Sequence, residues 1–275
     1  MASSFERNDR KRPGRTGPAP AGRGRPGSFK SQPDKDGSDW LWGWHAVAAA
    51  LGNPRRPEPK RLLATADRAR KLTETFGPIA ALTIAENTAI AAQLPPNAVH
   101  QGVALKTPPT PDLSLEELGE SSARFLLMLD QVTDPQNVGA IFRSAAAFGA
   151  GGVILQDRHA PALVGALAKA AAGGVDAIPH ARVTNLSRAL EQLAEMGWRA
   201  VGLDGAATQT LAEVLDERPT VLVLGSEGEG IRRLVAEHCD ALGCIPMPGG
   251  FESLNVSAAA AVALYEVSGR GVVKD

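Results

Sequence analysis

Phe125-Leu-Leu-Met-Leu-Asp-Gln-Val-Thr-Asp-Pro-Gln-Asn-Val-Gly-Ala-Ile-Phe-Arg143 is the stretch that decides the fold. It opens with an apolar run of strand length, Phe125–Leu129, and continues through a polar turn that contains Pro135. Asn137 can cap the helix that the apolar residues after it predict. A strand, a polar loop and a helix are therefore expected in direct succession.

The same alternation continues along the rest of the chain. Strand-like apolar runs follow at residues 152–155, 175–178, 200–203, 221–224 and 242–245. Helical segments are predicted at residues 138–148, 160–171, 186–196, 231–238 and 255–267. Apolar strands that alternate with helices indicate an α/β fold with a parallel sheet covered on both faces. Ligands bind such sheets beyond the carboxyl ends of the strands, so we expect the chemistry in the loops that follow the strands.

A smaller unit precedes this domain. Apolar residues at helical spacing predict a helix from Trp40 to Leu51. Strands at residues 61–65, 79–84 and 103–106 then alternate with helices at residues 66–76 and 86–94. Residues 107–123 are rich in proline and break the pattern. We therefore predict domains at residues 40–106 and 124–275, joined by a linker at residues 107–123.

Charge is distributed unevenly along the chain. Residues 1–39 hold nine Lys/Arg and five Asp/Glu, which gives +4; because the whole chain carries −1, the remaining residues carry −5. Residues 11–27 consist largely of Arg, Gly, Pro and Ala, so they have little to bury, and we expect a disordered tail over residues 1–39. Such a basic tail either attracts nucleic-acid phosphates without reading sequence or is only a solubilising extension.

Composition and missing motifs exclude several classes of protein. The chain is 44% hydrophobic and 21% charged, as soluble globular proteins are. No apolar run approaches the ~18 residues of a membrane-spanning helix and no secretory signal is evident, so we expect a cytoplasmic protein without a membrane partner. Cys239 and Cys244 are expected to be packed thiols, and the five histidines lack metal-site spacing, so no metal is expected. A P-loop, a dinucleotide-binding glycine motif and a Gly-x-Ser-x-Gly motif are all missing.

Two loops carry charged residues that need an explanation. Arg143 is the only charge in an otherwise apolar helical segment, so it needs either a buried carboxylate partner or a ligand. The loop Leu224-Gly-Ser-Glu-Gly-Glu-Gly-Ile231 contains three glycines, which permit close approach of the backbone to a ligand. Glu227 and Glu229 would repel a phosphate there, so a cation or a hydroxyl-bearing ligand suits this loop better.

A third loop, Ile245-Pro-Met-Pro-Gly-Gly-Phe-Glu-Ser-Leu-Asn-Val-Ser257, is stiffened by two prolines and shaped by two glycines. An Ala-rich helix follows it and would permit close approach of another backbone or subunit. Ser253 and Asn255 are either site residues or caps of that helix.

Together the three loops resemble the SPOUT superfamily, and specifically the SpoU/TrmH-type RNA ribose 2′-O-methyltransferases. The likeness covers residues 124–268 through N-x-G-A-x-x-R at 137–143, L-G-S-E-G-E-G at 224–230 and S-L-N-V-S at 253–257. The smaller unit, with Trp42-Gly-Trp-His-Ala-Val47 and Val99-His-Gln-Gly-Val103, is similar to the family's RNA-binding domain of ribosomal-protein L30e-like α/β type. The segment at 231–240 is most similar to the subgroup that methylates a guanosine of 23S rRNA.

The resemblance implies a deep trefoil knot in the parallel-sheet domain, which patterning alone would never propose. It also implies S-adenosyl-L-methionine as the cofactor and a homodimer with active sites near the subunit interface. The family's active-site positions correspond here to Asn137, Arg143, Glu227, Ser253 and Asn255. The positions that line its cofactor pocket correspond to Leu224, Gly225, Gly230, Ile245, Met247, Ser253 and Leu254.

The implied reaction moves a methyl group from a sulfonium to a ribose 2′-hydroxyl, which requires alignment and loss of the hydroxyl proton. A guanidinium hardly deprotonates, so Arg143 is expected to stay charged, to orient the target ribose–phosphate and to stabilise developing alkoxide charge. The target nucleotide is expected to be unpaired, because duplex RNA hides its base edges.

Three alternatives remain open from the sequence. The same chemistry could act on a guanosine of tRNA. The chain could be a non-catalytic RNA-binding or ribosome-assembly protein that retains the fold, although intact motif residues speak against this. A small-molecule α/β enzyme would leave the basic tail and the smaller unit without a role.

Overall fold

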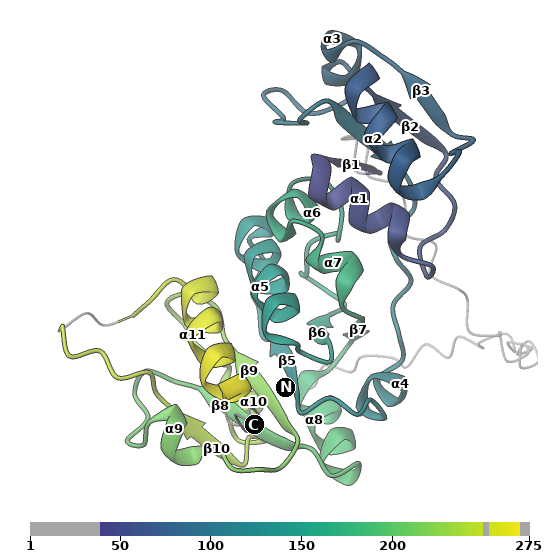
Figure 1. Ribbon diagram of the computed structural model, residues 1–275. Helices are drawn as coiled ribbons and strands as arrows, with labels where there is room; N and C mark the ends of the chain where they lie inside the picture. Colours follow the sequence, from purple (N-terminus) through teal and green to yellow (C-terminus); the bar gives the residue numbers. More distant parts are fainter. Residues whose placement is uncertain (1–38, 250–252, 270–275) are drawn as a thin grey trace, which may run out of the picture. The chain divides into compact units, whose positions relative to one another are not determined.

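The computed structural model describes residues 39–249 and 253–269. The disorder predicted for the basic tail therefore concerns residues that lie, except for Asp39, outside the described part of the chain. The described residues carry two separate sheets, one of four strands and one of six (Figure 1).

The four-stranded sheet is built from residues 40–106. Its elements are β1 (Trp40–Trp42), α1 (Trp44–Gly52), β2 (Arg61–Ala64), α2 (Ala66–Phe76), β3 (Leu82–Ile84), α3 (Asn87–Ala91) and β4 (Val103–Lys106). The strand order is β1-β4-β2-β3, with β4 antiparallel to both of its neighbours.

The predicted helix from Trp40 to Leu51 is wrong at its start. Trp40–Trp42 is a strand, because all three residues are buried and pair with β4. Gly43 then takes a φ of 87°, which lets the chain turn into α1. Three consecutive apolar residues fit a strand buried on both faces as well as they fit a helix.

The six-stranded sheet is entirely parallel and has the order β10-β8-β9-β5-β6-β7. Its strands are β5 (Phe125–Leu129), β6 (Val153–Gln156), β7 (His180–Val183), β8 (Arg199–Leu203), β9 (Thr220–Leu224) and β10 (Ala241–Gly243). Side chains of β5 alternate between two apolar clusters: Phe125, Leu127 and Leu129 enter one, and Leu126 and Met128 enter the other. The predicted parallel sheet covered on both faces is therefore confirmed.

Helices supply the two covering layers. The first cluster receives α5 (Pro135–Phe148), α6 (Gly165–Ala171), α7 (Gly174–Ala177), α9 (Leu211–Val214) and α11 (Val256–Gly269). The second receives α4 (Leu115–Gly119), α8 (Leu186–Glu195) and α10 (Arg233–Ala236). In Figure 1, α5 runs beside α6 and α7.

Several predicted elements differ from the structure. Residues 175–178 were expected to be a strand but lie in α7 and just after it, and the strand β7 follows. Gly174 packs so closely on α5 that an added Cβ would lie 2.6 Å from the Phe142 carbonyl oxygen. The segment predicted as a linker contains α4, which begins with a capping box between Ser114 and Glu117. The helix α9 was not predicted, and the helices expected at 160–171 and 231–238 are shorter than expected.

Residues 40–106 pack against the larger sheet's helices. Val164 and Ala168 belong to the same buried apolar cluster as Leu41 and Val47. A buried ion pair reinforces the contact, because Arg56 Nε lies 2.6 Å from Asp176 Oδ1 and both side chains are at most 3% exposed. The two sheets are therefore joined by a buried contact that contains both apolar side chains and an ion pair, in addition to the segment between them.

Candidate active site

Three loops meet at one edge of the six-stranded sheet. They follow β5, β9 and β10, and because these strands are parallel, their carboxyl ends lie at the same edge. The strands β5 and β9 are direct neighbours, and the Asp130 N–H donates to the Leu224 carbonyl at 2.8 Å as the two strands end.

The carboxylate of Glu227 joins the three loops. Its Oε1 atom accepts hydrogen bonds from Asn137 Nδ2 at 2.9 Å and from Asn255 Nδ2 at 2.6 Å. Asn255 Nδ2 also lies 3.0 Å from Asn137 Oδ1, and the Val256 N–H approaches the same Glu227 oxygen at 3.3 Å. We call these three residues the Asn137–Glu227–Asn255 cluster. Each comes from a different loop, so three of the five predicted active-site residues converge at this cluster.

The caps of two helices orient the amides of this cluster. Asp134, not Asn137 as predicted, caps α5, because its Oδ2 accepts the Asn137 N–H at 2.8 Å. Pro135 occupies the first turn, where its missing N–H costs nothing. The Asn137 amide is therefore free to bind Glu227. Asn255 does cap α11, since its Oδ1 accepts from the Ser257 N–H at 3.0 Å while its Nδ2 enters the cluster.

The glycine-rich loop folds tightly back on itself. Ser226 and Gly230 exchange backbone hydrogen bonds of 3.1 and 3.0 Å. A Cβ on Gly225 would lie 2.0 Å from the Gly230 carbonyl carbon, so only glycine fits there. Within this folded loop, the Glu227 carboxylate accepts from the amides of Asn137 and Asn255.

An ion pair that the sequence did not predict anchors the same loop. Asp130 is fully buried, and it accepts from the Arg232 N–H at 2.9 Å and from Arg232 Nε at 2.8 Å. The sequence contains one indication of this ion pair: Asp130 directly follows a wholly apolar strand, and a buried carboxylate needs a partner. The pair ties the end of β5 to the end of the Glu227 loop.

The Arg143 side chain is exposed and forms no hydrogen bond or ion pair with any described residue. Of the two alternatives for Arg143, the structure shows no buried carboxylate partner among the described residues: α5 buries Val138, Ile141, Phe142 and Ala145, and Arg143 lies off that face. Its guanidinium is free for a ligand, but the structure does not join it to the cluster. Ser253 is likewise exposed and has no hydrogen bond within the described segments.

The third loop offers backbone groups to a ligand. From Ile245 to Gly249, the N–H and C=O groups have no hydrogen-bond partner among residues 39–249 and 253–269. Such groups require water or a ligand. Met247 is half-buried beside them, and Leu254 is 40% exposed. Leu224, by contrast, places its side chain in the core, where it is 1% exposed.

The described residues include a half-buried thiol, Cys239. Burial raises the pKa of the Cys239 thiol to about 12, and the Asp240 and Asp130 carboxylates add to the effect, so this thiol stays protonated. Within the described residues, no group of three or more His, Cys, Asp or Glu side chains could hold a metal ion. No helix there combines the length and apolarity needed to span a bilayer.

Comparison with known proteins gives consistent matches. Residues 124–265 match the model of the SpoU rRNA Methylase family. An uncharacterized tRNA/rRNA methyltransferase of Mycobacterium avium is 44% identical over 176 residues, which are 62% of this chain and 57% of the relative. A counterpart in Synechocystis is 37% identical over 252 residues, or 88% of this chain and 65% of the relative. The chain thus spans less than two thirds of the length of these curated relatives.

Solved structures share the fold. The SpoU methyltransferase AviRb from Streptomyces viridochromogenes matches with a TM-score of 0.71 and 26% identity, over 85% of this chain and 90% of that chain. The structure of the same protein in complex with AdoMet matches with a TM-score of 0.71 and 24% identity, over 87% and 92% of the two chains.

Proposed function

The chain belongs to the SpoU rRNA Methylase family, and we propose that it transfers a methyl group from S-adenosylmethionine to a ribose 2′-hydroxyl of RNA. We propose a guanosine of large-subunit (23S) rRNA as the target. The observation that carries the proposal is the Asn137–Glu227–Asn255 cluster, which draws the three motif loops to one point.

The loops fit the cofactor in their chemistry. The unpaired backbone groups of residues 245–249 can bind a purine edge. The Gly225 backbone lies against the Gly230 backbone, and a side chain on Gly225 would prevent this contact. When bound, S-adenosylmethionine supplies a methyl group activated by a positively charged sulfur. We assign its binding to Gly225, Gly230, Ile245, Met247, Ser253 and Leu254, with Leu224 supporting the loop from the core.

The residues of the chain then have separate roles. Arg143 stays charged and, through its free guanidinium, orients the ribose–phosphate and stabilises negative charge that develops on the 2′-oxygen. Asn137 and Asn255 hold the three loops together through their hydrogen bonds to Glu227. Ser253 precedes Asn255 by two residues and is exposed, and we assign its hydroxyl a contact with the nucleotide. The hydroxyl proton leaves to phosphate or water, because a guanidinium is a very poor base.

We further propose that the larger domain is knotted and dimeric. The chain leaves the edge strand β10 and returns to pack α11 against α5 and β9, which supports a threaded path. On α11, Val262 and Tyr265 are 44% and 68% exposed, which supports burial against a second copy. The domain of residues 40–106 would hold the RNA.

Two other functions compete with this proposal. The relatives are named tRNA/rRNA methyltransferases, so a tRNA guanosine is the second candidate target. A non-catalytic RNA-binding protein would keep the fold but would have no need for the hydrogen-bonded cluster.

One experiment with two readouts tests the proposal. Calorimetry measures binding of S-adenosylmethionine to the purified chain, and a ribose-methylation map compares total RNA from cells with and without the protein. We expect binding and the loss of one 2′-O-methyl mark from large-subunit rRNA. A mark lost from tRNA instead would select the second target, and no binding would support the non-catalytic function.

A further inference from the structure

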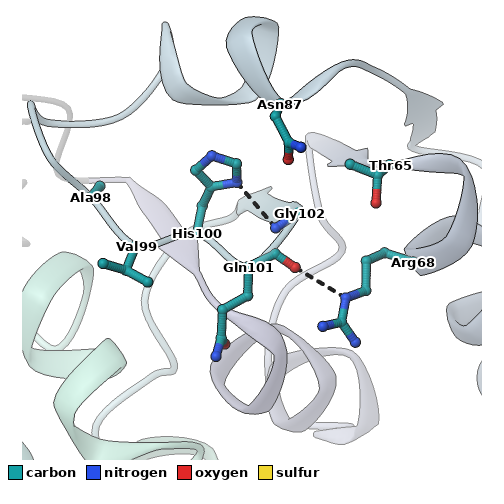
Figure 2. Close-up of a pocket in the computed structure, with 8 residues that line it drawn as sticks. All are labelled: Thr65, Arg68, Asn87, Ala98, Val99, His100, Gln101 and Gly102. Carbon is teal, nitrogen blue, oxygen red and sulfur yellow. Dashed lines mark hydrogen bonds between the residues drawn. The ribbon is translucent and has the colours of Figure 1, made fainter.

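A pocket of about 550 Å³ opens on the domain of residues 40–106, apart from the three motif loops (Figure 2). Its wall is made by residues 98–102, the loop that leads into β4, together with Thr65, Arg68 and Asn87. A volume of this size is typical of sites for small ligands. Of its described lining residues, Arg68 alone carries a permanent charge, and none is a carboxylate.

Arg68 is held in place at the pocket. Its guanidinium carbon lies 5.0 Å from the ring centre of Trp44, and its Nε donates to the Gln101 carbonyl at 3.0 Å. No described residue binds its two terminal nitrogens. The planar group therefore has Trp44 near one face, and its two terminal nitrogens are free to donate, which suits stacking on a base or pairing with a phosphate.

The other side chains offer hydrogen-bonding edges. His100 Nδ1 accepts the Gly102 N–H at 3.1 Å, so a neutral ring carries its proton on Nε2, which can donate. The Asn87 amide and the Thr65 hydroxyl each both donate and accept, and neither has a side-chain hydrogen bond with a described residue. Val99, which also lines the pocket, is 68% exposed. Mixed donors and acceptors beside an exposed apolar side chain match the edge and face of a heterocyclic base.

The pocket wall is connected to the larger domain. Gln101 Oε1 accepts from the Trp44 N–H and from Lys169 Nζ, each at 3.0 Å. Lys169 lies on α6, and α6 packs so closely on α5 that a Cβ on Gly139 would lie 2.5 Å from the Leu167 carbonyl oxygen. The helix α5 carries both Asn137 and Arg143. A ligand in the pocket is therefore held at a fixed position relative to the helix that carries the candidate active-site residues.

We propose that this pocket binds one unpaired nucleotide of the RNA, with its base among Asn87, His100 and the Arg68 guanidinium. The inference rests on the proposed function and deepens it, because it assigns a second, non-reacting nucleotide of the same RNA to a defined place. The base must be splayed out to enter, since a paired base has its edges occupied. Recognition of a second nucleotide, bound outside the three motif loops, would select one RNA site among many.

Nuclear magnetic resonance on the isotope-labelled full chain tests the proposal. The probes are a 12-nucleotide RNA of mixed sequence, the same strand in a blunt duplex, and adenosine, guanosine, cytidine and uridine 5′-monophosphates. We expect the single strand to shift the backbone amides of Val99, Gln101 and Gly102, and the duplex to leave them unchanged. A separate titration with S-adenosylmethionine reports on the loops at 224–230 and 245–249, so failure of the proposed function is recognised independently.

Variants identify the residues responsible. We expect Arg68→Ala to weaken single-strand binding about tenfold, the typical effect of losing a stacking partner. Arg70→Ala is the matched control, because it removes one positive charge from the same helix outside this pocket and should change the affinity less than about threefold. Asn87→Ala, an exposed position, gives a second test that does not depend on the folding of the Arg68 variant.

Three outcomes would overturn the proposal. The first is equal weakening by Arg68→Ala and Arg70→Ala, which would indicate non-specific attraction to phosphate. The second is a set of RNA-induced shifts confined to the loops of the larger domain. The third is binding of a free monophosphate as tight as that of the 12-nucleotide strand, which would indicate a site for a free nucleotide.

Discussion

At the scale of single residues, the Glu227 carboxylate explains why three distant motifs occur together. One oxygen accepts from two amides and one backbone N–H, so each loop depends on the other two. We predict that Glu227→Ala lowers the rate of methyl transfer about 100-fold, since loss of positioning by an ångström has an effect of that size. The free energy of unfolding should fall by only about 1 kcal/mol, because the cluster is exposed.

Glu229→Ala is the matched control, because Glu229 lies in the same loop and forms no hydrogen bond or ion pair with a described residue. Turnover with radiolabelled S-adenosylmethionine and urea unfolding measure the two effects. Equal rates for the two variants would contradict the role of the cluster.

The Arg143 guanidinium has no partner among the described residues, so its proposed role in catalysis needs a separate test. We predict that Arg143→Lys, which keeps the charge but loses the planar fork, lowers kcat about 100-fold while leaving the affinity for S-adenosylmethionine unchanged. Single-turnover kinetics and calorimetry measure these quantities, and Arg188→Lys, on the exposed side of α8, is the control. Near-normal turnover of the Arg143 variant would refute its assigned role.

His238 gives a prediction for the pH dependence of stability. Its pKa is raised because its ring bonds to the Leu234 carbonyl, and secondarily to Glu191 on α8. A raised folded-state pKa means that the stabilisation is fully present below the ordinary pKa of about 6.5 and is lost as the pH rises through the raised value. Urea unfolding at pH 5.5 to 8.5 should show this decline in the native chain, and a flatter profile in His238→Gln. An identical decline in both would exclude His238 as its source.

The sequence predicted the three residues of the cluster but not the neighbouring residues that hold their loops in place. Asn137, Glu227 and Asn255 were recognised from motifs, and the structure brings them together. The capping role of Asp134 was missed, because Asn and Asp are nearly equal as caps and the chain offers both within four residues. The pairing of Asp130 with Arg232, 102 positions apart, is a tertiary contact that local pattern cannot reveal.

At the scale of elements, prediction succeeded where an apolar run and a clear turn signal coincide. The strand β5 was predicted with its observed bounds, and the helix α5 and the strand β9 nearly so. The misplaced strand at 175–178 shows the limit, because four apolar-rich residues do not distinguish a strand from a helical turn. There the contact of Gly174 with α5 decides the conformation, and that contact is not local.

Close packing of α5 on α6 gives a prediction at this scale. A Cβ on Gly139 would lie 2.5 Å from the Leu167 carbonyl oxygen and 2.7 Å from the Ala170 Cβ, so the helices would have to separate. We predict that Gly139→Ala lowers the free energy of unfolding by about 1–3 kcal/mol, despite the better helix propensity of alanine. Urea unfolding measures the effect, and Ala147→Ser, at an exposed position of the same helix, is the control. A stabilised Gly139 variant would show that the helices adjust freely.

At the scale of the whole molecule, the contact between the two sheets sets the position of residues 40–106, which we propose to bind RNA, relative to the candidate active site. Asp176, on α7, accepts hydrogen bonds from Arg56 at 2.6 and 3.1 Å, from Asn53 at 3.0 Å and from Thr110 at 3.2 Å. These donors come from the loop after α1 and from the segment that joins the sheets. One buried carboxylate therefore binds both the loop after α1 and the segment that leads to the six-stranded sheet.

Replacing that carboxylate should uncouple the two sheets. Asp176→Asn leaves the buried Arg56 without a countercharge, and we predict a loss of about 3–5 kcal/mol with two calorimetric transitions in place of one. Replacing Arg56 and Asp176 together by Met and Leu should recover part of the loss, because an apolar pair needs no countercharge. Glu237→Gln, which breaks the exposed pair with Arg233, should change stability by less than about 1 kcal/mol.

For methyl transfer, the KM for RNA should rise in Asp176→Asn while the affinity for S-adenosylmethionine stays unchanged. A single transition with an unchanged KM would mean that the apolar contact alone positions the two domains.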